Sequence, residues 1–160
     1  MKHVLSIILV GVVIFQTIQL STLVHPIAAI EHRPNPLQEA AIKMGLGDPG
    51  EKILNAVTIA SKQSGLSPEF ILALMWTESS FKMNAVSGKN YQGLMQIPQR
   101  IHDEDINCLI GAKIFVEKLK ITQGDYRRAL ILYKGWALNH PEGKRQADKV
   151  IQLTMKLKEV

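Results

Sequence analysis

The sequence predicts a mainly α domain of about six to seven helices, with at most a small β-hairpin. Apolar residues recur every three or four positions in several segments, which is the spacing of a buried helix face. Gly and Pro residues separate these segments, and no long run alternates apolar and polar residues as a half-buried strand would. Hydrophobic residues make up 46% of the 160 residues and charged residues 21%, so the chain suits one globular domain.

The predicted helices follow one another with short connections. They cover residues 37–45, 51–64, 67–79, 105–120 (starting at Asp105 or Asn107), 125–133 and 142–158. The third has the clearest start, because Ser67 can cap it, Pro68 fits its first position and Glu69 suits its first turn. It is apolar on nearly every side as far as Trp76, so we expect a buried central helix with Trp76 in the core. Residues 84–92 are expected to form a loop with room for the small hairpin.

The N-terminal segment differs in composition from the rest of the chain. Residues 1–29 contain one Lys and no Arg, Asp or Glu, and residues 4–15 are almost purely apolar, which is typical of a secretory signal. The alternative is an uncleaved membrane anchor over residues 4–24. We therefore expect a signal peptide or signal anchor at 1–29, a linker at 30–36 and a single domain at 37–160, exported to the periplasm or the extracellular space.

Composition also excludes several classes of protein. The formal net charge of +5 is small and spread along the chain, so we expect no nucleic-acid partner. The single cysteine, Cys108, excludes an internal disulfide framework and a cysteine-rich zinc module. The histidines show no ligand spacing, and we predict no metal ion and no cofactor; these histidines are His3, His25, His32, His102 and His140.

Glu78 is a carboxylate on an apolar face. It follows Leu74 by four residues and Met75 by three, so it lies on the same side of the predicted central helix. Burial and the negative end of the helix dipole both disfavour its charged form, as a general acid requires. The alternative is that Glu78 merely marks the point where a buried helix reaches water.

Motifs around Glu78 favour the catalytic interpretation. Ser87 follows Glu78 by nine residues and Gln96 follows it by eighteen, and the motifs are Glu78-Ser79-Ser80-Phe81, Asn84-Ala85-Val86-Ser87 and Gly93-Leu94-Met95-Gln96. Their combination and spacing resemble the SLT domain of lytic transglycosylases, the bacterial relatives of goose-type lysozyme. The resemblance covers roughly residues 51–150 and implies a lysozyme-like fold.

The resemblance also implies an activity. Members of this family cleave the β-1,4 bond between N-acetylmuramic acid and N-acetylglucosamine in peptidoglycan. The muramic C6 hydroxyl attacks its own anomeric carbon and leaves a 1,6-anhydro end, so one carboxyl can act first as acid and then as base. The implied partners are therefore peptidoglycan glycan strands. The small size resembles transglycosylases that serve a secretion, conjugation or pilus machine.

The resemblance assigns roles to five residues. Glu78 matches the catalytic acid and base, and Ser87 matches a serine near the acetamido group of the substrate. Met95 and Gln96 match positions that line the groove, although Met95 could equally pack in the core. Tyr133 matches a tyrosine whose hydroxyl hydrogen-bonds to the catalytic carboxyl.

One departure from the family pattern follows Tyr133, where Lys134 replaces the usual Asn. An ammonium aimed at Glu78 would stabilise the ionised carboxylate and oppose proton donation, so we expect Lys134 to point away, toward anionic glycan or water. Trp136 and Tyr91 could stack on sugar faces or lie in the core.

Two alternatives to the transglycosylase hypothesis remain. A second carboxylate from the acidic run Asp103, Glu104 and Asp105 would suit a hydrolytic, lysozyme-type muramidase, although the run also suits the start of the next helix. A non-catalytic protein that binds peptidoglycan in an assembly would keep the scaffold without the chemistry.

Overall fold

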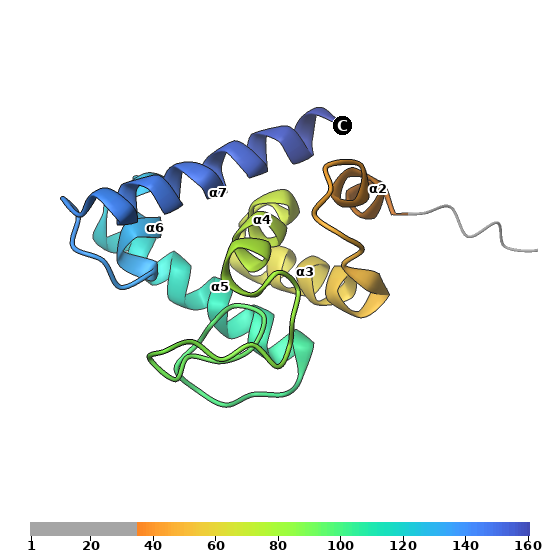
Figure 1. Cartoon of the computed structure of the whole chain (residues 1–160), viewed down its shortest axis with the longest axis horizontal. Helices are drawn as coiled ribbons and strands as arrows, with labels where there is room; N and C mark the ends of the chain where they lie inside the picture. Colours follow the sequence, from red (N-terminus) through yellow and green to blue (C-terminus); the bar gives the residue numbers. More distant parts are fainter. Residues whose placement is uncertain (1–34) are drawn as a thin grey trace, which may run out of the picture. The chain divides into compact units, whose positions relative to one another are not determined.

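The computed structural model describes residues 35–160, so the predicted signal and most of the predicted linker lie outside the described residues. The described part contains six helices and no strand, which confirms the mainly α prediction. The helices are α2 (Pro36–Lys43), α3 (Gly50–Ser64), α4 (Pro68–Ser79), α5 (Glu104–Ile121), α6 (Tyr126–Tyr133) and α7 (Pro141–Glu159) (Figure 1). Within residues 35–160, no helix combines the length and the apolar character that crossing a bilayer requires.

Polar side chains start the helices close to the predicted positions. Ser67 caps α4 by accepting a hydrogen bond from the backbone N–H of Phe70 at 3.3 Å. Asp103 caps α5 and Asp125 caps α6 in the same way. Each cap satisfies a backbone donor that the first helical turn leaves unpaired. The acidic run at the start of α5 therefore caps and begins a helix.

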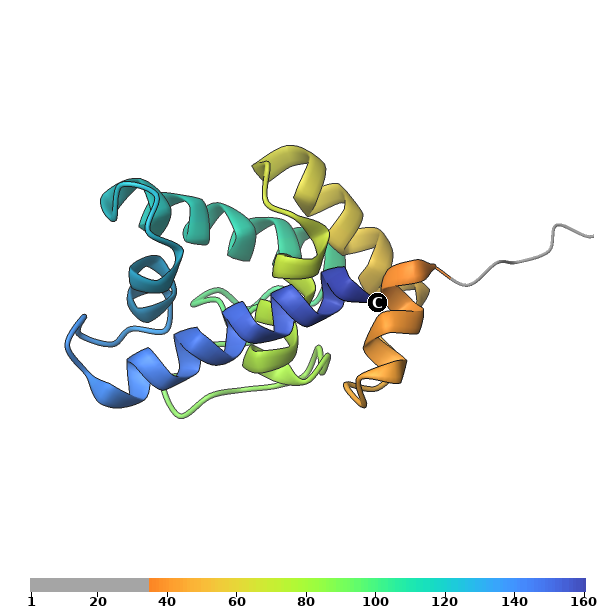
Figure 2. The same ribbon diagram turned by 90° about the horizontal axis from the view of Figure 1, so that it is seen from above.

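Helix α4 is the buried centre of the domain. Helices α3 and α7 both pack against it, and α5 packs against α3 (Figures 1 and 2). Every residue from Phe70 to Met75 is at most 3% exposed, which confirms the predicted central helix. Full burial of each large apolar side chain contributes about 1.5–3 kcal/mol, so this helix is a main source of stability.

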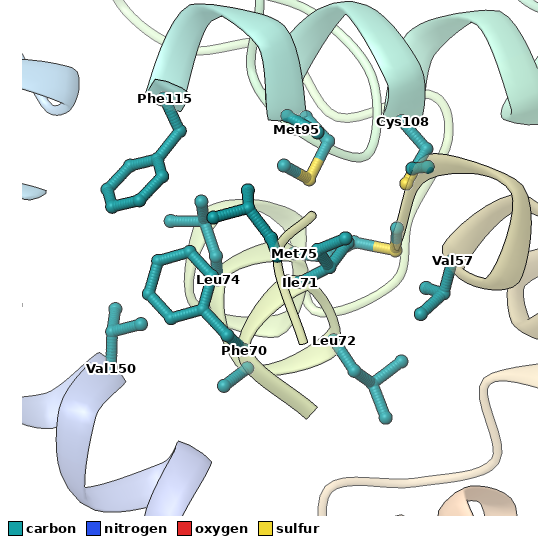
Figure 3. Packing of buried hydrophobic residues seen from close by; sticks show 14 of the residues in the cluster. Val57, Phe70, Ile71, Leu72, Leu74, Met75, Met95, Cys108, Phe115 and Val150 are labelled. Atoms are coloured by element: carbon teal, nitrogen blue, oxygen red, sulfur yellow. The ribbon is translucent and has the colours of Figure 1, made fainter. Parts of the chain in front are cut away.

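An aromatic cluster joins three helices near the N-terminal end of α4. Phe70 and Phe115 have ring centroids 4.6 Å apart, and Tyr126 meets Phe70 edge to face at 5.2 Å. These tilted and T-shaped arrangements are the ones that aromatic quadrupoles favour. Figure 3 shows Phe70 and Phe115 among the core residues between α4 and its neighbours.

The prediction that Trp76 lies in the core is wrong. Trp76 is half-buried, its Nε1 donates to the Leu46 carbonyl at 2.9 Å, and the Lys149 ammonium lies 4.7 Å from its ring centroid. An indole N–H needs a hydrogen-bond partner, and the backbone after α2 supplies one at the edge of the core.

The long connection between α4 and α5 is held together by backbone hydrogen bonds. Val86 and Gln92 form one isolated antiparallel bridge, and Gln92 and Ile97 form another. The sequence predicted a small hairpin at most in this region, and the structure has these two isolated bridges there. The bridges fold the connection, residues 80–103, into a compact lobe beside the end of α4 (Figure 1).

Helix α5 contacts this lobe through a residue with no side chain. A Cβ atom added to Gly111 would lie 2.4 Å from Met95 Cβ and 2.8 Å from Met95 Cγ, far inside van der Waals contact. Met95 is fully buried at this contact. Gly111 therefore sets how closely the lobe approaches α5.

We expect Gly111→Ala to destabilise the fold by about 1–3 kcal/mol, because the added methyl meets the inflexible Cβ of Met95. The same change at an unhindered helix position stabilises a protein by about 1 kcal/mol, so the expected sign is reversed. Urea unfolding followed by circular dichroism measures the effect. Gly88→Ala is the matched control, since nothing lies within 4 Å of the added atom. A Gly111→Ala variant as stable as the native protein would contradict this packing.

Candidate active site

Glu78 lies at the C-terminal end of α4, where the buried helix leaves the core. Its side chain is 14% exposed. The next two residues after Ser79 turn the chain sharply, because Ser80 and Phe81 both adopt left-handed backbone conformations with φ of 51° and 64°. Such conformations cost of order 1–3 kcal/mol each in non-glycine residues and concentrate at functional sites. The turn exposes one edge of Glu78 and leads the chain into the lobe.

Glu78 borders a cavity of about 260 Å³ that four separate parts of the chain enclose. Helix α4 supplies Glu78. The other lining residues come from the lobe, from α6 with the segment after it, and from α7. The lining residues are Glu78, Ser87, Gly88, Lys89, Tyr91, Gln96, Tyr133, Lys134, Trp136 and Gln146. The structure thus brings together four of the five predicted site residues, from positions up to 55 residues apart in the sequence.

Ser87 shapes the part of the lobe that borders the cavity. Its Oγ accepts hydrogen bonds from the backbone N–H groups of Tyr91 at 3.0 Å and Lys89 at 3.3 Å. Its own N–H donates to the Tyr91 carbonyl at 2.9 Å. The hydroxyl therefore closes a tight turn, and its hydrogen remains available to a ligand in the cavity.

Gln96 is held in a fixed position beside the cavity. Its Nε2 donates to the carbonyls of Ala85 at 3.0 Å and Gly93 at 2.9 Å, and its backbone is left-handed with φ of 47°. Both amide hydrogens are thus used to tie the lobe together. The side-chain oxygen is the group of Gln96 that has acceptor capacity left for a substrate.

The Met95 side chain packs in the core and does not line the cavity, so of its two expected positions the structure shows the core. The side chain is fully buried against α5 at Gly111, and Figure 3 shows it within the core. Its backbone contributes instead. The Met95 N–H donates to Asn107 Oδ1 at 3.0 Å, and the Met95 carbonyl accepts from the Tyr133 hydroxyl at 2.7 Å.

Tyr133 lines the cavity, but its hydroxyl does not donate to Glu78 as predicted. A phenol has one hydrogen, and Tyr133 gives it to the Met95 carbonyl. Burial raises the pKa of Tyr133 well above 10.0, and the nearby charge of Glu78 raises it further. Tyr133 is therefore neutral, and it fastens the lobe to α6.

Lys134 points at Glu78, which corrects the expectation that it points away. Its Nζ lies 2.6 Å from Glu78 Oε1, and its side chain is 5% exposed. Lys134 follows the last residue of α6, so the helix that places Tyr133 also aims Lys134 into the cavity. The two side chains form a short, largely buried ion pair at the edge of the cavity.

Glu78 is the one carboxylate among the described residues that line the cavity. The side chain of Asp103 accepts a hydrogen bond from the Ile106 N–H at 2.9 Å, and Glu104 and Asp105 belong to the first turn of α5. Glu142 does not line the cavity. Hydrogen bonds from Arg145, and to a smaller extent from the lining residue Gln146, lower the pKa of Glu142 to about 2. The acidic run therefore supplies no second carboxylate to the cavity.

Two aromatic residues from different segments of the chain line the cavity. Tyr91 is 36% exposed on the lobe, and Trp136 lies after α6 with its ring stacked on His140 at 4.2 Å. The Lys89 ammonium lies 5.8 Å from the centroid of the Trp136 ring. Tyr91 is thus the more exposed ring, while Trp136 already contacts His140 and Lys89.

The described residues offer no evident metal site. Within residues 35–160, no three His, Cys, Asp or Glu side chains gather in a group that could hold a metal ion.

Asn107 is a site-building residue whose role the sequence did not reveal. It is fully buried in α5, it accepts from Met95 N–H, and its Nδ2 donates at longer range to the carbonyls of Gln92 and Ile101. A Cβ at Gly93 would lie 2.2 Å from Asn107 Nδ2, so Gly93 allows the lobe to approach this amide. An Asn on the buried face of a predicted helix is the signal that indicates such an anchor.

We expect Tyr133→Phe to lower the free energy of unfolding by about 1–3 kcal/mol at pH 7, because the buried Met95 carbonyl loses its donor. The pH dependence should also change. A tyrosine in the unfolded chain ionises near pH 10 while folded Tyr133 stays protonated, so the native protein loses stability as the pH rises above 10.0. Tyr133→Phe has no phenol at this position, so its stability should not show this loss above pH 10.0.

Urea titrations from pH 7 to 11 measure both effects. Tyr126→Phe is the control, because Tyr126 is 40% exposed and its ring contacts survive the change. Identical pH profiles for the native protein and Tyr133→Phe would contradict the buried, neutral phenol.

Comparison with known proteins connects this geometry to a family. The model of the family described as "Transglycosylase SLT domain" matches residues 55–152, more than half of the chain. The curated relatives include the membrane-bound lytic murein transglycosylases C of Serratia proteamaculans (strain 568) and Sodalis glossinidius (strain morsitans). Each is 46% identical over 60 residues, which cover 38% of this chain and 17% of the relative. No solved structure gives a significant match. The chain belongs to the transglycosylase SLT domain family.

Proposed function

We propose that this protein is a peptidoglycan lytic transglycosylase in which Glu78 is the catalytic acid and base. The proposed reaction cleaves the β-1,4 bond between N-acetylmuramic acid and N-acetylglucosamine and forms a 1,6-anhydromuramyl end. Family membership and the names of the curated relatives support this reaction class.

The observation that carries the proposal is a cavity with one carboxylate. Retaining and inverting glycosidases that use water place two carboxylates about 5–9.5 Å apart across the bond. Glu78 faces no such partner among the described lining residues. A mechanism in which one carboxyl serves twice fits this arrangement.

The proposed mechanism has two proton transfers through Glu78. The protonated carboxyl donates its proton to the glycosidic oxygen as the C1–O bond breaks and the N-acetylglucosamine end leaves. The muramic C6 oxygen then bonds to C1, and the Glu78 carboxylate accepts the proton of the C6 hydroxyl. Glu78 ends protonated, as it began, and no water is consumed. Holding the nucleophile in the substrate itself favours this path entropically.

The other lining residues would bind and orient the glycan. The Ser87 hydroxyl and the Gln96 side-chain oxygen present polar groups on the lobe side, where they could hydrogen-bond to acetamido or hydroxyl groups. Tyr91, which is 36% exposed at the cavity, is the aromatic residue that could stack on a sugar. Tyr133 supports this wall through Met95.

A second candidate function is a non-catalytic peptidoglycan-binding protein of an assembly. The ion pair between Lys134 and Glu78 favours it, because Lys134 occupies an oxygen of the carboxyl group that the enzyme would need for proton transfer. Binding to purified peptidoglycan without any cleavage product from pH 4 to pH 9 would support this candidate over the enzyme.

The site of action that we propose is outside the cytoplasm. The composition of residues 1–29 supports export, either by a cleaved signal or with residues 4–24 as an anchor. The curated relatives are named as membrane-bound. The partner that we propose for it there is a secretion, conjugation or pilus machine.

We expect Glu78→Gln to reduce release of 1,6-anhydromuropeptides from purified peptidoglycan by about 10²–10⁴-fold or more, since the amide can neither donate nor accept the proton. Mass spectrometry of the soluble products measures this loss. Glu69→Gln is the matched control on the same helix, because Glu69 lies in its first turn, away from the cavity. Equal release by Glu78→Gln and the native protein would refute the assignment, and reducing muramyl ends would indicate a hydrolytic muramidase.

A further inference from the structure

The cavity beside Glu78 holds more cationic than anionic side chains. Among the described residues that line it, the carboxylate is that of Glu78 and the two ammonium groups are those of Lys89 and Lys134. Lys134 forms the ion pair with Glu78, so no carboxylate of the cavity balances the charge of Lys89. None of the four ion pairs among residues 35–160 includes Lys89. A cation without a partner is therefore presented where the proposed substrate binds.

Lys89 lies at the tip of a tight turn of the lobe. Its backbone N–H donates to Ser87 Oγ at 3.3 Å, and the N–H of Asn90 donates to the Ser87 carbonyl at 2.9 Å. Asn90 has a left-handed backbone, with a φ of 61°. These contacts fix the point at which the Lys89 side chain leaves the lobe, at the border of the cavity.

The Lys89 side chain reaches from the lobe to the segment after α6. Its Nζ lies 5.8 Å from the centroid of the Trp136 ring and 3.4 Å from the position that a Cβ would take on Gly135. Trp136 is itself held in place, because its ring stacks on His140 at 4.2 Å and its Cβ lies against Gly143 of α7. A ring face attracts an ammonium, and the N–H groups that point away from the ring stay free to donate to a ligand.

The proposed substrate carries its negative charge on the muramyl units. The sugar rings and their acetamido groups are neutral, whereas the lactyl ether of N-acetylmuramic acid ends in a carboxyl group. Where a peptide stem is attached, this carboxyl is an amide and the free carboxylates lie on the stem. Where the stem has been removed, the lactyl carboxylate is free. N-acetylglucosamine has neither group, so a cation in the cavity can distinguish the two sugars.

We propose that Lys89 binds a carboxylate of the muramyl unit and makes the site select charged glycan over neutral glycan. The identity of this ligand rests on the proposed function. Lys89 determines specificity in this proposal and takes no part in the proton transfers of Glu78. A hydrogen bond from an ammonium to a carboxylate is roughly twice as strong as one between neutral groups, which makes such a contact selective. The lactyl group and the peptide stem offer the same chemistry, and the test separates them.

The first measurement is of binding, with ligands that the proposed reaction cannot consume. The disaccharide N-acetylglucosaminyl-β-1,4-N-acetylmuramic acid ends at the muramyl unit and lacks the bond that is cleaved. Three forms of it are compared, namely the free lactyl acid, its neutral methylamide, and the form that carries a peptide stem. NMR titrations give the dissociation constants for the native protein, Lys89→Met, Lys89→Arg and Lys82→Met.

We expect the native protein to bind at least one charged form about three- to thirtyfold more tightly than the methylamide. Lys89→Met keeps the length of the side chain without its charge, so this preference should fall to about one. Lys89→Arg should keep most of the preference. Lys82→Met is the matched control, because it makes the same charge change at an exposed residue of the lobe that does not line the cavity, and it should keep the native preference.

The form that loses affinity in Lys89→Met identifies the source of the carboxylate. A loss with the free acid assigns the lactyl group, and a loss with the third form assigns the stem. Equal preferences in the native protein and Lys89→Met would overturn the proposal. So would a native protein that binds all three forms equally.

The second measurement is of cleavage, on peptidoglycan with its carboxyls intact and on the same material with its carboxyls converted to methylamides. The ratio of the two kcat/KM values should follow the binding preference in each protein, and it replaces that preference if the disaccharides bind too weakly to measure. If no protein cleaves either material while the binding preference depends on Lys89, the proposed function fails and the carboxylate site stands. If 1,6-anhydro ends form and Lys89→Met keeps the native ratio, this inference fails and the proposed function stands.

Discussion

The arrangement of this domain depends on one constraint, which is that α4 has no polar side. Residues Phe70 to Met75 must be excluded from water all around the helix, so α3, α7 and the lobe before α5 have to enclose it. The helix reaches solvent at its C-terminal end, and Glu78 lies there. The same burial that stabilises the domain thus places one carboxylate at the edge of a cavity with little freedom to move.

The lobe that completes the cavity places Leu94, Met95 and Ile97 in the core, and a few specific contacts fix its position further. Asn107 binds the Met95 N–H, and Gly111 and Gly93 let backbone and side chains approach where any Cβ would collide. Tyr133 ties the same residue to α6 through the Met95 carbonyl. Together with the burial of the apolar residues of the lobe, these contacts fix Ser87 and Gln96 relative to Glu78.

Helix positions were predictable because the signals are local. The cap at Ser67 and the apolar spacing placed α4 correctly, and the buried stripe singled out Glu78. Contacts between distant segments were not predictable in the same way. The sequence left Met95 between the cavity wall and the core, and the space at Gly111 of α5 accommodates its side chain in the core. Lys134 was expected to avoid Glu78, yet the end of α6 aims it at the carboxylate. Neither outcome follows from spacing along the chain, since each depends on where a second element lies.

The central claim is that a single carboxylate cleaves the glycan without water as the nucleophile. Digestion of purified peptidoglycan in H₂¹⁸O, followed by mass spectrometry of the new muramyl ends, tests it most directly. The account predicts 1,6-anhydro ends that contain no ¹⁸O, because the oxygen that bonds to C1 comes from the C6 hydroxyl of the same sugar. One ¹⁸O atom at each new muramyl end would show that water attacks, and would contradict the one-carboxylate mechanism.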